Sequence, residues 1–154
     1  MTKEIQEPGE LIFLRYAFSV IRYCSKKAVS ANEILKFEKM LKLGGIPSRK
    51  RLEQLFPDAV EHLKSWDYED VRNYWLVEHN KLVLENPLCR VYAGETLEIL
   101  PPANGEICRV RVKGIETISQ KSYISLKKGN LVSMHAFQIA EKLSQKEFLE
   151  YFRK

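Results

Sequence analysis

Two stretches of the sequence determine how the rest can be interpreted: Pro87–Ile99 reads PLCRVYAGETLEI and Leu131–Leu143 reads LVSMHAFQIAEKL. The first contains Cys89, has a glycine five residues later at Gly94, and alternates in the manner of a β-strand. The second is an apolar run with a single histidine, His135, and we expect it to form a strand that leads at once into a helix. A thiol and an imidazole at the edges of predicted strands are the combination in this sequence that indicates chemistry.

The sequence between these two stretches has the pattern of short strands and tight turns. Turns are indicated by Pro101–Gly105 and Lys127–Asn130, and strands by residues 106–113, 115–120 and 121–126. Short strands at this spacing predict a small OB-like β-barrel. Ser144, with Glu147 three residues later, is typical of a capped helix that begins at the end of the barrel.

The residues before Pro87 have helical periodicity. A helix over residues 10–24 is apolar on most sides and is expected at the centre of a helical bundle. Ser30 with Glu33 predicts a capping box, Gly44–Gly45 a helix end, and Asp67 the cap of a last helix. Asn86–Pro87 is a natural boundary, because a proline disfavours helix at the residue before it. We therefore predict an α+β chain with a helical domain at 1–86 and a barrel with a C-terminal helix at 87–154.

Composition and charge exclude several classes of protein. The chain has 154 residues, of which 45% are hydrophobic and 29% charged, and a net charge of +5, as expected of a folded globular protein. Its polar start does not resemble a signal peptide, and no apolar run could span a bilayer, so a cytoplasmic protein without membrane contact is expected. Three cysteines, far apart, argue against a disulfide scaffold and a zinc finger.

The two stretches resemble the HypC/HupF hydrogenase assembly chaperones. Cys89–Ile99 matches the opening of that family, Met-Cys-Leu-Ala-Val/Ile-Pro-Gly followed by Lys-Val-Val-Glu-Ile, with the cysteine, Gly94, glutamate and isoleucine in one register. Gly129–Leu143 is similar to the closing stretch of the family, Gly-Asp-Tyr-Val-Leu-Val-His-Ala-Gly-Phe-Ala-Ile-Glu-Lys-Leu. The whole chain, from Leu14–Phe18 to Lys128–His135, also resembles an uncharacterised family that joins a helical region to such a tail, and no activity comes with that second resemblance.

The chaperone resemblance implies a non-enzymatic assembly factor for a metalloenzyme. In that family the cysteine and histidine help to handle an iron atom that carries cyanide and carbon monoxide, together with a partner scaffold, before the hydrogenase large-subunit precursor is escorted. Carried over, this implies binding by Cys89, Gly94 and His135, with Cys89 and His135 as transient iron ligands. The implied partners are a hydrogenase large subunit or a maturation scaffold.

Two alternatives from other classes stay open. An OB-like barrel could contact nucleic acid through Arg90, Arg109, Arg111 and Lys113, because the last three alternate along one strand and share a face. Residues 87–154 carry 11 Lys/Arg against 7 Asp/Glu, whereas residues 1–86 carry 14 against 13, so the basic excess is mild. The tail could also be a protein-docking module that keeps only the fold. No enzyme is expected, since neither a phosphate loop nor a catalytic triad is recognisable.

Overall fold

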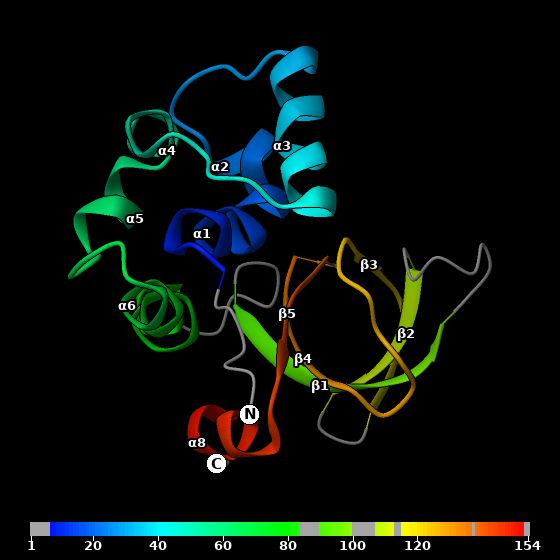
Figure 1. The fold of residues 1–154 in the computed structure, drawn as a ribbon. Coiled ribbons are helices and arrows are strands. Elements are labelled where there is room, and N and C mark those ends of the chain that lie inside the picture. The colour runs from blue at the N-terminus through cyan, green and yellow to red at the C-terminus, as the bar shows by residue number, and fades with distance from the viewer. Residues whose placement is uncertain (1–6, 84–89, 100–106, 113–114, 137, 153–154) are drawn as a thin grey trace, which may run out of the picture. The chain divides into compact units, whose positions relative to one another are not determined.

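A computed structural model describes residues 7–83, 90–99, 107–112, 115–136 and 138–152, and of residues 98–99, 107–112, 115–120 and 152 it describes the backbone only. The described residues form helices followed by strands, so the predicted α+β class is confirmed (Figure 1). The chain divides into two compact units, Met1–Trp75 and Leu76–Lys154. No helix in the described part of the chain is both long and apolar enough to cross a membrane.

The first unit is built around its first helix. α1 spans Gly9–Ala17, and every residue of this helix is buried. It continues through a 3-10 turn, Phe18–Val20, into α2, Ile21–Cys24. The ring of Phe13 lies 5.5 Å from that of Trp66 and 5.4 Å from that of Trp75. The prediction that this apolar helix forms the centre of the helical core is confirmed.

Ser30 and Ser48 are the N-caps of two helices of the first unit. α3 spans Ala31–Leu43, and the Ser30 hydroxyl accepts a hydrogen bond from the backbone N–H of Glu33 at 3.1 Å. The carboxylate of Glu33 does not complete the predicted capping box, because it accepts two hydrogen bonds from the guanidinium of Arg51, at 2.6 and 2.7 Å. Arg51 belongs to α4, Arg49–Leu55, so this pair ties one helix to the next.

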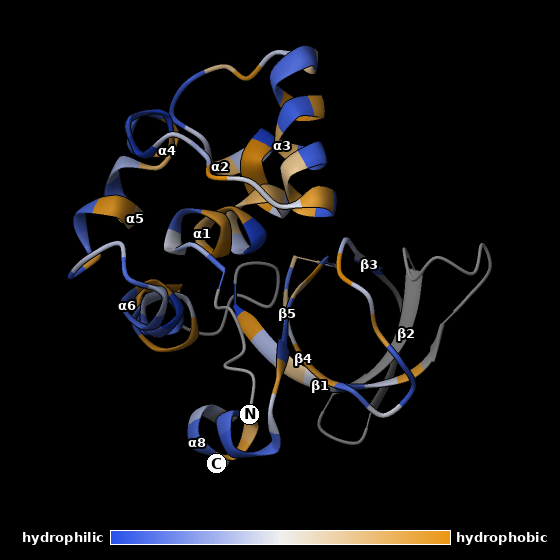
Figure 2. Ribbon diagram, in the orientation of Figure 1, coloured by the Kyte–Doolittle hydropathy of each residue, from blue (hydrophilic) through white to orange (hydrophobic). Residues whose placement is uncertain are grey.

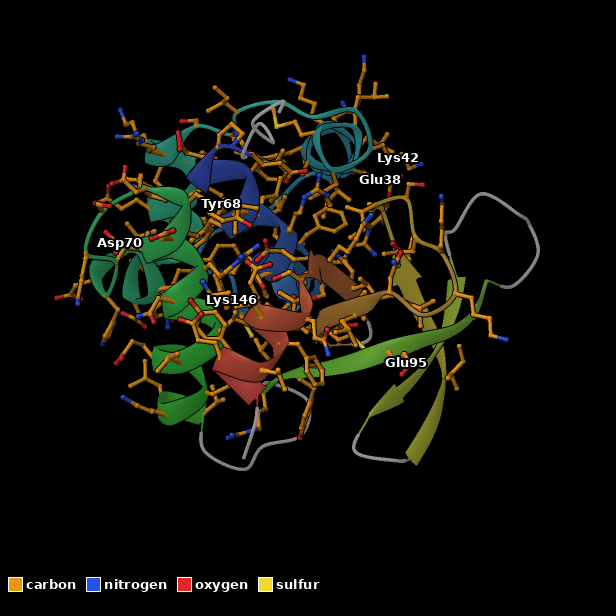
Figure 3. The ribbon with its side chains drawn as sticks, turned by 60° about the horizontal axis from the view of Figure 1, so that its bottom comes forward. Glu38, Lys42, Tyr68, Asp70, Glu95 and Lys146 are labelled. Carbon is orange, nitrogen blue, oxygen red and sulfur yellow. The ribbon has the colours of Figure 1, made fainter. Side chains whose placement is uncertain are left out.

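α3 carries both polar and apolar residues, as the mixed blue and orange of this helix show in Figure 2. Ile34, Phe37 and Leu41 are its buried residues. On the outer side the Lys42 ammonium and the Glu38 carboxylate form an ion pair at 3.6 Å, one turn apart (Figure 3). Gly44, at φ +84°, ends the helix as predicted.

Short helices complete the helical part of the chain. α5 spans Pro57–Glu61 and α6 spans Tyr68–Asn73. Asp67 occupies the N-cap position of α6, but its side chain makes no capping bond. Instead, the Ser65 hydroxyl accepts a hydrogen bond from the Asp67 N–H and donates one to the Asp70 carboxylate. α6 continues as a π-helix over Tyr74–Glu78 and as α7 over His79–Val83.

The second unit is a five-stranded barrel with a helix after its last strand (Figure 1). The strands are β1 (Val91–Ile99), β2 (Ile107–Val112), β3 (Ile115–Ser122), β4 (Leu131–His135) and β5 (Gln138–Leu143). Their order is β1-β2-β3-β5-β4, and β4 pairs with β1 to close the barrel. All pairs are antiparallel except β3 with β5. α8, Gln145–Phe152, follows a complete capping box between Ser144 and Glu147.

Two strand predictions were wrong. Residues 115–126, expected as two short strands, contribute a single strand, β3, that ends at Ser122. Gln138–Leu143, expected to continue from the strand of His135 directly into a helix, is instead strand β5. It pairs antiparallel with β4 and parallel with β3, and these ladders outweigh the helical propensity of Ala140, Glu141 and Lys142. The helix begins only after the Ser144 cap.

The border between the two units lies earlier than the predicted boundary after residue 86. Residues 76–83, which include α7, belong to the unit that contains the barrel. A contact that no sequence pattern indicates joins these residues to the first strand: the side chain of Asn80 hydrogen-bonds to the backbone of Val91 at the start of β1. The predicted boundary falls on residues 84–89, which lie outside the described part of the chain.

Ala136, between β4 and β5, has a backbone conformation that favours glycine. Its φ is +48°, in the left-handed region that costs an L-residue about 1 kcal/mol. We expect Ala136→Gly to raise the free energy of unfolding of the barrel by about 1 kcal/mol, measured by chemical denaturation. Ala93→Gly, in the middle of β1, is the matched control and should lower it by a similar amount, since glycine weakens a strand interior. A loss of stability in both variants would contradict the strain at Ala136.

Candidate functional site at the β1–β4 pair

The two stretches that carry the sequence motifs are neighbours in the barrel. β1 pairs antiparallel with β4, and Val91 lies opposite His135 while Gly94 lies opposite Val132. These segments are separated by some forty residues of chain, so the barrel topology, and not local sequence, brings them together. The glycine and the histidine of the motifs therefore lie on one pair of strands, three positions apart in its register.

The two faces of this strand pair have different surroundings. Val132 and Met134 belong to an apolar cluster with Leu126 and Ile139, against which Tyr92 packs. Because side chains alternate along a strand, His135 and Ser133 project to the other face of β4. That face is also buried, with His135 2% and Ser133 0% exposed.

The buried face that carries His135 is polar. Along β5, Gln138 lies opposite His135 and Glu141 lies opposite Ser133. Gln138 is 6% and Glu141 is 5% exposed, so four neighbouring polar side chains are withdrawn from water here. Buried polar groups of this kind are normally hydrogen-bonded, and they specify one arrangement of the strands that carry them.

His135 contacts a second imidazole. The rings of His135 and His79 lie edge to face, with their centroids 5.0 Å apart and their planes at 82°. His79 is the first residue of α7 and is 9% exposed. Burial first and the neighbouring His135 second lower the pKa of His79 to about 4, while a hydrogen bond with Asn80 acts in the opposite direction. His79 is therefore neutral at pH 7, and the pair can pack without charge repulsion.

Asn80 holds α7 against the start of β1. Its Oδ1 accepts a hydrogen bond from the Val91 N–H at 2.7 Å, and its Nδ2 donates one to the Val91 carbonyl at 2.9 Å. Arg90 adds a longer hydrogen bond, from Nη1 to the Asn80 carbonyl at 3.5 Å. Consecutive residues of α7 thus contact both members of the Val91–His135 cross-strand pair.

Several predicted site residues cannot be placed with the pair. Cys89 and Lys113 lie outside the described residues, and Arg109 and Arg111 are described only as backbone positions on β2. Sequence reasoning found His135 and Gly94 but missed His79 and Asn80. These two lie some fifty residues before His135, on a helix with no recognisable motif, so no spacing could have indicated them.

The described residues contain no group of three His, Cys, Asp or Glu side chains that could hold a metal ion. The two imidazoles alone would supply two ligands, fewer than the four of a structural zinc site. Comparison of the chain with protein-family models, with curated proteins and with solved structures found no match. What the site can do must therefore be inferred from its own geometry and chemistry.

Proposed function

We propose that this chain is a non-enzymatic assembly factor for a metalloenzyme, related to hydrogenase maturation and acting through Cys89 and His135. The observation that carries the proposal is the register of β1 and β4, in which Val91, two residues after Cys89, lies opposite His135. Cys89 itself lies outside the described residues, and it precedes this cross-strand pair by two positions in the sequence.

The arrangement of the strands supports the resemblance to the HypC/HupF chaperones. Both matching stretches are placed on adjoining strands, the first on β1 and the second on β4 and β5. Five strands arranged as a barrel are also the number found in OB-like domains. Two unrelated short matches in the sequence would not be expected to lie on paired strands.

The proposed chemistry follows from the two side chains. A thiolate is a soft, strong ligand for iron, and an imidazole beside it can bind iron or hydrogen-bond to the other ligands of the metal. A site with so few protein ligands holds iron weakly enough to pass it on to a partner. Because the partner must reach these two side chains to take up the iron, contacts between proteins are expected as well.

The test is affinity purification of the tagged chain from its native organism under strictly anaerobic conditions, with iron analysis and mass spectrometry of co-purifying proteins. We expect iron and a hydrogenase large subunit or maturation scaffold to co-purify with the wild type and to be lost with Cys89→Ala. Cys24→Ala is the matched control, because Cys24 is an exposed cysteine on α2. Loss in both variants, or in neither, would contradict the proposal.

The nucleic-acid alternative is weakened by the register of β1 and β2. Arg111 lies opposite Glu95, and Arg109 lies opposite Glu98. The backbone register thus places a glutamate position opposite each of these two arginine positions. A surface that binds phosphates needs an excess of positive charge, and two acidic partners in the register argue against such an excess. Arg109→Glu should accordingly leave any salt-sensitive binding of single-stranded oligonucleotides unchanged.

A further inference from the structure

α7 is attached to the barrel by an unusual use of an asparagine side chain. The described pairing of β1 with β2 runs from Glu95 to Ile99 and does not include Val91. At Val91, the amide of Asn80 both accepts from the backbone N–H and donates to the backbone carbonyl, as a neighbouring strand would. Asn80 is 8% and Val91 1% exposed, so water cannot readily replace either bond.

His79, the residue before Asn80, contacts His135, which lies opposite Val91 in the β1–β4 pair. The His79 ring packs edge to face on the His135 ring, and both are less than a tenth exposed. A rigid helix turn therefore fixes the start of β1 with one side chain and covers an imidazole of β4 with the next. Movement of α7 would release the β1 start and uncover His135 in one step.

We propose that Asn80 and His79 are positioning residues for His135, and that α7 is a clamp that controls access to this imidazole. The inference rests on the proposed function, in which His135 is a binding residue. With α7 in place, Asn80 fixes the strand end opposite His135, and His79 shields the imidazole. A partner or a metal reaches His135 only when the clamp opens.

The chain offers a direct test, because it has three histidines and one of them is an internal reference. Diethyl pyrocarbonate modifies unprotonated imidazoles that reach solvent, and the modified residue is identified by mass spectrometry of peptides. His62 is exposed, and its Nδ1 lies 2.7 Å from the Asp58 carbonyl oxygen. In the wild type at pH 7 we expect His79 and His135 to react at least about tenfold more slowly than His62. In Asn80→Ala both should accelerate together while His62 does not change.

Ser122→Ala is the control for a general loosening of the barrel. The Ser122 hydroxyl donates to the Ile124 carbonyl at 2.9 Å and accepts from the Ile124 N–H at 3.2 Å, so this variant also removes two hydrogen bonds. It should leave the reactivity of His135 unchanged. Amide hydrogen exchange supplies a second readout: Asn80→Ala should accelerate exchange in α7 but not at Val132 or Ile139 in the apolar cluster.

Two results would overturn the clamp. One is a wild-type His135 that reacts as fast as His62. The other is an Asn80→Ala variant in which His135 responds no more than in Ser122→Ala, or in which exchange accelerates equally at Val132 and Ile139. Neither readout involves iron or a partner protein. The clamp and the proposed function can therefore fail independently of each other.

Discussion

Acidification from pH 6.5 to pH 4 should remove about 3 kcal/mol from the free energy of unfolding through His79 alone. In the folded chain the pKa of His79 is lowered to about 4, by burial first and by His135 second. In the unfolded chain it returns to its ordinary value of 6.5. Between these two values the unfolded state binds a proton that the folded state does not, so stability falls as the pH falls. The contribution is fully present above pH 6.5 and is lost below pH 4.

A non-titrating ring at the same position isolates this contribution. His79→Phe keeps an aromatic side chain against His135 but cannot take up a proton. Between pH 6.5 and pH 4 its free energy of unfolding should therefore fall by about 3 kcal/mol less than that of the wild type. His62→Phe is the control, because it makes the same substitution at an exposed histidine. The two tryptophans, Trp66 and Trp75, are both in the first unit, so the barrel unit is better followed by amide exchange at β4 and β5. Equal pH dependence in His79→Phe and the wild type would contradict the assignment.

The helices were predictable because their signals are local. The apolar positions of α1 and the serine and glycine at the ends of α3 lie within a few residues of what they specify. One predicted local hydrogen bond is absent because its acceptor binds a residue farther along the chain. Glu33 binds Arg51 of the next helix instead of closing the capping box, and this ion pair has no signature in the sequence around Ser30.

Strand β5 shows the opposite case, in which tertiary pairing decides. Gln138–Leu143 has the composition of a helix and is directly followed by a helix cap. It is nevertheless a strand, because only in extended form can it pair with β3 on one side and β4 on the other. Without β5 the order β1-β2-β3-β5-β4 could not close, so the barrel depends on the element that the sequence indicated least well.

The candidate site likewise contains residues that have a local sequence signal and residues that do not. His135 and Gly94 could be found because they belong to recognisable stretches of sequence. His79 and Asn80 could not, because their importance comes from contacts with Val91 and His135 across the fold. An asparagine that imitates a strand and a histidine that packs on a histidine are visible only once the helix and the barrel are placed together.

Gly9→Ala should destabilise the first unit by about 3 kcal/mol, although helix propensity predicts the opposite sign. Gly9 is the first residue of α1, where alanine is ordinarily the better helix former by up to about 1 kcal/mol. A Cβ at this position would overlap the carbonyl oxygen of Trp66. The clashing atom is backbone, so no change of rotamer can relieve it, and either α1 or the segment before α6 must move.

Tryptophan fluorescence during urea denaturation measures this effect directly, since Trp66 is at the clash and Trp75 packs on Phe13 of the same helix. Asn32→Ala is the matched control, because it places an alanine in the first turn of α3 at an exposed position. It should change stability by less than about 0.5 kcal/mol. If Gly9→Ala were as stable as the wild type, α1 would have to lie farther from Trp66 than the fold places it. The sign of the change in the free energy of unfolding of Gly9→Ala therefore tests the packing on which the helical core depends.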